Sequence, residues 1–273
     1  MPVPDADTKA DLALMEAAVR EAGKIARSYF GGHYRSWDKG KGQPVTEADL
    51  AVDHFLRDTL TAARPDYGWL SEETEHDPRR LSAANTFVVD PIDGTVGFLK
   101  GRPQFTICAA VVHDGRATSG VIFNPMTEEC FTAREGGGAH LNAQPIAVSA
   151  RNAVEGCRML AAKATIAHQA WSSTPSGPWP AMAVETRSSI AYRMALVAGG
   201  GYDAMLALSA KHDWDLAAGD VIVREAGGRV TDHLGAALCY NGAAPIQPSV
   251  VCAGPALHAL LLDRLAHVPM PRH

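Results

Sequence analysis

The stretch that decides the fold runs from Thr86 to Phe98 and reads Thr-Phe-Val-Val-Asp-Pro-Ile-Asp-Gly-Thr-Val-Gly-Phe. Its apolar, β-branched start is typical of a buried strand that delivers Asp90 to its end. Pro91 then predicts a turn, and Asp93 follows directly after it. Two carboxylates at a rigid strand end repel each other unless a cation lies between them. Taken alone, the pattern fits a metal site and a turn with solvated acids equally well.

Further acidic motifs elsewhere in the chain shift this balance toward a metal site. They are Val-Thr-Glu-Ala-Asp at 45–49, Ser-Glu-Glu-Thr at 71–74, Trp-Asp-Leu-Ala-Ala-Gly at 214–219 and Glu-Ala-Gly-Gly at 225–228. With Asp-Pro-Ile-Asp-Gly-Thr they resemble, in type and order, the hallmarks of the inositol monophosphatase superfamily of metal-dependent phosphatases. The similarity spans about residues 10 to 265. Several motifs that occur together are far more specific than any one of them.

The resemblance implies a fold, a cofactor and a ligand set. The implied fold is α+β, a layered α-β-α-β-α sandwich with the active site between its halves. The implied cofactor is Mg²⁺, as two or three ions that Mn²⁺ can replace, and hard oxygen ligands suit such ions. The expected ligands are Glu72, Asp90, the backbone carbonyl of Ile92, Asp93 and Asp215. Glu73 is the weaker ligand of its pair, because the position of the family's ligand matches Glu72.

The resemblance also assigns catalytic and phosphate-binding roles. Asp49 lies in a segment that fits a helix-capping box, and in the family its counterpart hydrogen-bonds the threonine at Thr95 to orient the attacking water. With Glu72, these two residues are the predicted catalytic residues. Backbone N–H groups of Gly94 and Thr95 are expected to bind phosphate, since glycine allows close approach of an anion. Lys39 is a further phosphate-binding candidate, and Lys41 is its alternative.

Composition and charge limit the partners and the cellular compartment that we expect for the protein. The chain has 273 residues and a net charge of −5, which argues against binding a nucleic-acid polymer. Its five cysteines show no C-x-x-C spacing and read as free thiols of a reducing compartment. The N-terminal residues do not resemble a signal peptide, and no apolar run reaches membrane-spanning length. We therefore expect a cytoplasmic protein without membrane contact, and the family resemblance implies a homodimer inhibited by Li⁺.

Periodicity predicts two halves, residues 1–148 and residues 149–273. The first half is an α+β unit that carries most metal ligands. Its expected helices cover 7–30 and 46–63, and its strands include a hairpin through Asp114-Gly115. The second half is α/β and completes the site. Its alternating pattern predicts strands near 158–161, 202–208 and 249–253, with helices near 188–198, 215–226 and 255–267.

Two departures from the inositol phosphatase pattern bear on the substrate, a small phosphorylated metabolite. Gly97 stands where an asparagine is common, and no acid occurs from Ala204 to His212, where one usually contacts sugar hydroxyls. The segments Trp-Asp-Lys at 37–39, Pro-Val-Thr-Glu-Ala-Asp-Leu at 44–50 and Lys-His-Asp-Trp-Asp-Leu-Ala-Ala at 211–218 resemble the bacterial 3′(2′),5′-bisphosphate nucleotidase branch. This resemblance implies conversion of adenosine 3′,5′-bisphosphate to AMP. Leu208 is expected to pack against a base or ribose. The cationic candidates for the second phosphate are Lys100, Arg102, Arg193 and Lys211.

Two alternatives to this substrate prediction stay open. The first is a phosphatase of inositol 1-phosphate or a related sugar phosphate. The second, of another class, is a phosphatase-like regulatory protein without catalysis, which has no need to keep mutually repelling acids.

Overall fold

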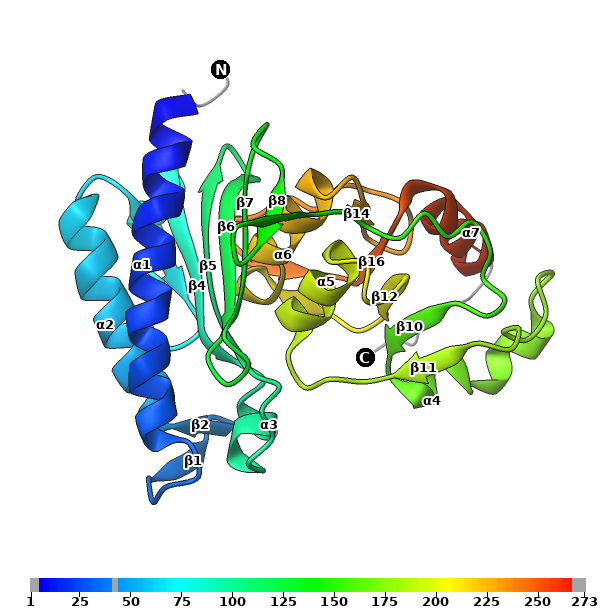
Figure 1. Ribbon diagram of the computed structural model, residues 1–273, viewed down its shortest axis with the longest axis horizontal. Helices are drawn as coiled ribbons and strands as arrows, with labels where there is room; N and C mark the ends of the chain where they lie inside the picture. Colours follow the sequence, from blue (N-terminus) through cyan, green and yellow to red (C-terminus); the bar gives the residue numbers. More distant parts are fainter. Residues whose placement is uncertain (1–4, 41–43, 267–273) are drawn as a thin grey trace.

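The computed structural model describes residues 5–40 and 44–266, and these residues form five layers (Figure 1). Helices α1 (Asp5–Tyr29) and α2 (Glu47–Ala63) cover one face of a seven-stranded sheet. Helices α5 (Ile190–Ala198) and α6 (Asp213–Glu225) fill the space between this sheet and a five-stranded one, and α7 (Pro255–Leu265) covers the far face of the latter. The predicted α-β-α-β-α sandwich is confirmed.

The seven-stranded sheet has the order β3-β4-β5-β6-β7-β8-β9. Only β3 and β4 are parallel, and every later neighbour is antiparallel. The predicted hairpin joins β5 to β6, with Asp114 and Gly115 in the left-handed region at φ 47° and 75°. The strands are β3 (Gly68–Ser71), β4 (Asn85–Asp93), β5 (Thr106–His113), β6 (Arg116–Asn124), β7 (Glu129–Arg134), β8 (Ala139–Leu141) and β9 (Gln144–Ile146).

The turn predicted at Pro91 is wrong, because β4 continues through it to Asp93. Asp90 pairs with Cys108 of β5, whereas Asp93 pairs with Thr106, so β4 advances three residues while β5 advances two. One extra residue in one strand is a β-bulge. Residues three apart on a regular strand face opposite sides of the sheet, and one extra residue reverses that relation. The bulge therefore allows both carboxylates to reach the same side.

The five-stranded sheet has the order β11-β10-β12-β16-β14. Its strands β10, β11 and β12 are parallel, and β16 runs antiparallel to both of its neighbours. The polypeptide leaves β12 at the carboxyl edge of this sheet and reaches α6 within a few residues. The strands are β10 (Arg158–Ala161), β11 (Ala183–Glu185), β12 (Ala204–Ala207), β14 (Arg229–Thr231) and β16 (Val250–Ala253).

Helix α6 belongs to the predicted second half but packs on β5 and β6 of the first sheet. Gly120 of β6 permits this close approach, since a Cβ there would lie 2.9 Å from Cα of Ala218. One core cluster therefore contains buried residues from both sides of residue 148. The division of the chain at that point stays a prediction.

Short elements complete the fold, and sequence periodicity did not indicate most of them because they are too short for an alternating pattern. Strands β1 and β2 pair antiparallel with each other. Among the described helices, none combines the length and the apolar character that a membrane span requires. The short elements are β1 (Ser36–Asp38), β2 (Pro44–Thr46), η1 (Pro78–Ser82), α3 (Thr95–Leu99), α4 (Lys163–Ile166), η2 (Gln169–Ser173), β13 (Lys211–His212) and β15 (Ile246–Gln247).

Candidate active site

Three predicted ligands converge where β4 meets the start of α6. One carboxylate oxygen from each of Asp90, Asp93 and Asp215 lies within 4.8 Å of the others. Asp215 is the third residue of α6, and its Oδ2 accepts the backbone N–H of His212 at 2.9 Å. This capping contact fixes the carboxylate at the helix start. The three side chains, which we call the acidic trio, come from two segments more than a hundred residues apart in the sequence.

The electrostatics of the acidic trio fit a bound cation. Burial, together with the charges of Glu72, Asp93 and Asp215, raises the pKa of Asp90 well above its usual range. Burial and the charge of Asp93 raise the pKa of Asp215 to about 8. Oδ1 of Asp90 is buried and has no hydrogen-bond partner. A buried carboxylate oxygen without a partner is costly unless something else binds it, and a hard divalent cation meets that requirement.

Asp93 has a second task that the sequence did not reveal. Its carboxylate accepts the Ser189 hydroxyl at 2.7 Å and the backbone N–H groups of Ala191 and Ile190 at 2.6 and 3.2 Å. These donors belong to the first turn of α5, where free N–H groups and the helix dipole favour an anion. Asp93 therefore ties the first sheet to the middle helical layer. Ser188-Ser189 is a helix-start signal, but nothing in the sequence links it to Asp93.

The structure shows a reason for glycine at position 94 that the sequence did not indicate. Gly94 has φ 99°, a conformation that favours glycine, and a Cβ there would lie 3.0 Å from the backbone nitrogen of Ser189. Glycine is therefore required for packing against the start of α5 and for the left-handed backbone. Contact of the backbone N–H of Gly94 with phosphate stays a prediction.

Asp49 and Thr95 are in contact. Asp49 Oδ2 accepts the backbone N–H of Thr46 at 2.8 Å and also the Thr46 hydroxyl, which completes the predicted capping box of α2. Its other oxygen accepts the Thr95 hydroxyl at 3.1 Å. Burial raises the pKa of Asp49 to about 6, although the hydrogen bonds from Thr46 and Thr95 oppose this shift. The carboxylate is thus mostly ionised at neutral pH and able to accept from Thr95.

The predicted carbonyl ligand lies beside the same threonine. Ile92 is buried in the bulge of β4, and its carbonyl oxygen lies 3.0 Å from the Thr95 hydroxyl. The hydroxyl has a single proton, so when Asp49 accepts it both lone pairs of the Ile92 carbonyl are left for a cation.

Glu72 lies beside the acidic trio and not within it. Its charge contributes to the raised pKa values of Asp90 and Asp215, and its Oε1 accepts Lys39 Nζ at 3.1 Å. Lys39 also donates to Glu73 at 2.7 Å. Burial and the charge of Glu72 raise the pKa of Glu73 to about 7, although the Lys39 contact opposes the shift. The structure thus brings Lys39 to the acidic pair, whereas its alternative Lys41 lies outside the described residues.

These raised pKa values predict how pH affects the metal-free protein. In the unfolded chain, aspartates release their protons near pH 3.9. In the folded protein Asp49 releases its proton near pH 6 and Asp215 near pH 8, so between about pH 4 and 8 the folded state binds more protons. These groups therefore lower the free energy of unfolding as pH rises through that window.

We expect the unfolding temperature of chelated protein to fall from pH 5 to pH 8, and Mg²⁺ to restore more stability at pH 8 than at pH 5. Equal Mg²⁺ stabilisation at both pH values in calorimetry would contradict this electrostatic account.

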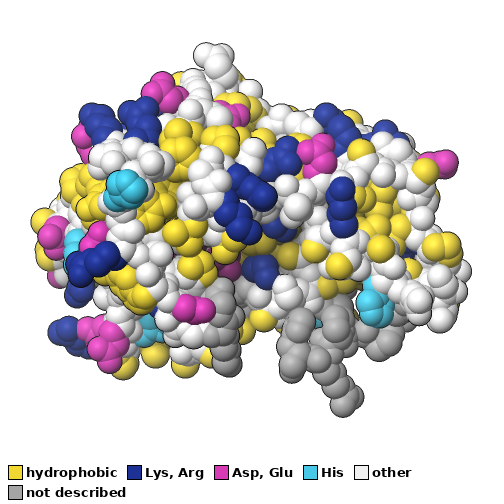
Figure 2. Space-filling view, turned by 90° about the horizontal axis from the view of Figure 1, so that it is seen from below, with side chains coloured by type: hydrophobic (Ala, Val, Ile, Leu, Met, Phe, Trp, Pro, Cys, Tyr) yellow, Lys and Arg dark blue, Asp and Glu magenta, His cyan; other side chains and the backbone are white. Residues whose placement is uncertain are grey.

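Cationic side chains of the second half lie near the acids of the site. Figure 2 shows Lys and Arg side chains gathered around a hollow in the middle of one face. Of the predicted cations, Lys211 interacts electrostatically with Asp215, and Arg193 with Asp93. Arg193 also donates from Nε to the carbonyl of Arg187 at 2.7 Å, which partly engages its guanidinium. Lys100 and Arg102 lie on the exposed surface.

The expected role of Leu208 is wrong. This side chain is only 7% exposed and packs within a core cluster that includes Cys157 and Trp171. It therefore has little surface left for contact with a nucleobase. The adjoining Ser209 instead accepts Lys211 Nζ through its hydroxyl at 2.8 Å.

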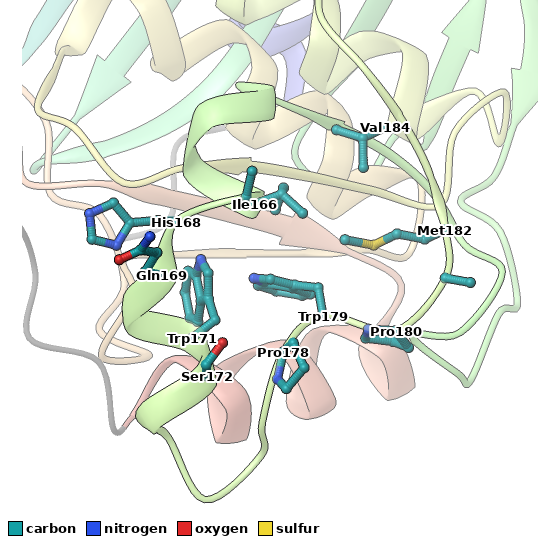
Figure 3. A pocket seen from close by; sticks show the side chains of 12 residues that line it. Ile166, His168, Gln169, Trp171, Ser172, Pro178, Trp179, Pro180, Met182 and Val184 are labelled. Atoms are coloured by element: carbon teal, nitrogen blue, oxygen red, sulfur yellow. The ribbon is translucent and has the colours of Figure 1, made fainter.

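A cavity of about 390 Å³ lies away from this chemistry, between η2, the loop that follows it and β11 (Figure 3). Trp171 and Trp179 both line it and contact each other edge to face, with ring centroids 5.1 Å apart. Neither a carboxylate nor any predicted site residue lines it. The cavity therefore contributes nothing to the acidic site.

Comparisons with known proteins agree with this arrangement. The model of the inositol monophosphatase family matches residues 7–269. An inositol-1-monophosphatase of Rhizobium meliloti is 33% identical, covering 95% of this chain and 97% of its own. A protein named Nus factor SuhB from Xylella fastidiosa is 34% identical over 72% of both chains. The structure of the extragenic suppressor protein SuhB from Bartonella henselae superposes with a TM-score of 0.82 at 29% identity, covering 94% of this chain and 98% of that one.

Proposed function

The chain belongs to the inositol monophosphatase family and is a metal-dependent phosphoric monoester hydrolase, and on this premise we propose how its residues act. The proposal assigns Mg²⁺ to the acidic trio of Asp90, Asp93 and Asp215, joined by Glu72 and the carbonyl of Ile92. The observation that carries it is the convergence of three carboxylates within 4.8 Å, one with a buried oxygen that lacks a partner. When bound, Mg²⁺ lowers the pKa of water and stabilises charge on phosphate and on the leaving oxygen.

The remaining residues position the reactants. Asp49 accepts a hydrogen bond from the Thr95 hydroxyl. Because the hydroxyl proton is directed at Asp49, the lone pairs of the Thr95 oxygen can face a water molecule. That water would attack phosphorus directly, so inorganic phosphate leaves without a phosphorylated residue. Lys39 and the N–H groups of Gly94 and Thr95 are proposed to bind phosphate oxygens. In this role Lys39 would give up its contact with one of the two carboxylates, Glu72 or Glu73, and donate to a phosphate oxygen.

For the substrate we propose adenosine 3′,5′-bisphosphate, converted to AMP and phosphate. Two observations support this choice. No carboxylate occurs between Ala204 and His212 to accept the hydroxyls of a polyol, and such a lost partner weakens binding of a hydroxylated ring. Lys211, near Asp215, supplies positive charge beside the acidic trio, and a second phosphate requires charge beyond that of the metal ions.

Inositol 1-phosphate is the second candidate, and one observation favours it. The Rhizobium meliloti relative named inositol-1-monophosphatase covers nearly the whole chain. Moreover, the burial of Leu208 removes one expected contact with a base.

The substrate is tested by measuring kcat/KM for the bisphosphate, inositol 1-phosphate and a hexose phosphate at saturating Mg²⁺. We expect the bisphosphate to be preferred, and Lys211→Met to lower its kcat/KM more than that of inositol 1-phosphate. Lys24→Met, a change at an exposed lysine of α1 that is no candidate for phosphate binding, serves as the matched control. A preference for inositol 1-phosphate of tenfold or more, about 1.4 kcal/mol, would reverse the ranking.

A regulatory role without catalysis is the rival from another class, since relatives carry the name Nus factor SuhB. The retained acidic trio and the Asp49–Thr95 contact support catalysis, because repelling acids have no use in a binding protein.

A homodimer and a cytoplasmic location are also proposed. All five cysteines are free, which fits a reducing compartment.

A further inference from the structure

A second buried carboxylate lies one helical turn beyond Asp49 on α2. Asp53 is only 2% exposed, and its two oxygens accept hydroxyl protons from Ser71 and Thr74. The Thr74 contact measures 2.7 Å, and Thr74 in turn accepts Trp69 Nε1 at 3.2 Å. The two hydroxyls flank Glu72 and Glu73 directly in the sequence. Asp53 therefore holds both ends of the segment that carries the acidic pair.

The position of Asp53 explains why this tie matters. Residues four apart on a helix share one face, so Asp49 and Asp53 project from the same side of α2. Asp49 accepts the Thr95 hydroxyl, whereas Asp53 accepts the two hydroxyls beside Glu72. One rigid helix thus sets the position of two parts of the active site.

A carboxylate at this place also carries an electrostatic cost. Burying a carboxylate is costly unless it is hydrogen-bonded, and two hydroxyl donors compensate that cost here. Only an ionised carboxylate accepts both hydroxyl protons, since an amide has one acceptor oxygen and would turn its NH₂ toward one hydroxyl.

We propose that Asp53 is a positioning residue that fixes Glu72 for metal binding, an inference that rests on the proposed metal site. It acts through Ser71 and Thr74 and does not itself touch the metal or the substrate. Residues that orient ligands through hydrogen bonds typically change metal affinity by about 10–100-fold when removed.

The test measures Mn²⁺ binding to the chelated full-length protein by electron paramagnetic resonance, without substrate. We expect Asp53→Asn to raise the Kd for Mn²⁺ by about tenfold or more. Thr74→Val and Ser71→Ala should each raise it by less, and adding Thr74→Val to Asp53→Asn should change little further, because both act through one contact. Asp58→Asn, at an exposed position on the same helix, is the matched control and should leave the Kd unchanged.

A merely structural role would give a different result. It would lower the unfolding temperature of Asp53→Asn while the Kd for Mn²⁺ stays within twofold of wild type, and that outcome overturns the inference. If Asp53→Asn does not fold, unchanged Kd values in both Ser71→Ala and Thr74→Val overturn it equally. If the wild type binds no Mn²⁺, the proposed metal site fails first, and the two failures are therefore distinguishable.

Discussion

Asp90→Asn is expected to lower kcat by more than a hundredfold and to stabilise the metal-free protein. The substitution keeps the shape of the side chain but removes an acid whose ionisation is opposed by burial and by the charges of Glu72, Asp93 and Asp215. The amide of asparagine is a poor metal ligand, and it would replace the carboxylate whose Oδ1 has no hydrogen-bond partner. Loss of a direct ligand should exceed the roughly 10–100-fold effect of disturbing an outer partner. Phosphate release and calorimetry of the chelated variant measure the two effects.

Asp90 is a better test position than Asp93. Asp93 also accepts three hydrogen bonds from the start of α5, so Asp93→Asn would turn an amide toward N–H donors and disturb packing. A variant at Asp90 changes the charge with fewer side effects. Near wild-type turnover of Asp90→Asn on every accepted substrate would show that the acidic trio does not hold a catalytic metal.

Thr95→Ala is the second substitution with a large expected effect. It removes the hydroxyl that donates to Asp49 and that we propose orients the attacking water. Contributions of positioned proton-transfer groups are typically about 10²–10⁴-fold. The loss should appear in kcat, with a smaller change in the Mg²⁺ concentration for half-maximal activity, because the acidic trio remains.

Thr95→Ser provides the matched control, since it keeps the hydroxyl and removes one methyl group. It should retain most activity, whereas Asp49→Asn should resemble Thr95→Ala. Equal losses in Thr95→Ala and Thr95→Ser would indicate that packing of this 9% exposed side chain matters, and not its hydroxyl.

The sequence predicted those features of the fold that depend on residues adjacent in the chain. The helix-start signal at Thr46 and the hairpin at Asp114-Gly115 are set by neighbouring residues, and both occur as expected. The acidic motifs contain the three carboxylates that the structure brings together, and each motif could be recognised because it is contiguous. Their convergence followed only from the family resemblance, since spacing alone does not place Asp215 beside Asp90.

What the sequence could not predict depends on long-range packing. The bulge of β4 is visible only in its pairing with β5, where Asp93 faces Thr106. The contact between Asp93 and Ser189 joins residues 96 positions apart, and the burial of Leu208 reflects the core around it. Asp53 has no motif of its own, and its role became visible only when Ser71 and Thr74 were found to share its carboxylate.

The central claim is that this protein releases phosphate from a small phosphomonoester through metal held by the acidic trio. The most direct measurement is phosphate release from the bisphosphate, inositol 1-phosphate and a hexose phosphate by wild-type protein before chelation, after chelation and after Mg²⁺ is restored. The account predicts activity on at least one substrate that chelation abolishes and Mg²⁺ restores. Activity that persists at full rate after complete chelation, or no phosphate release from any substrate with Mg²⁺ present, would contradict it.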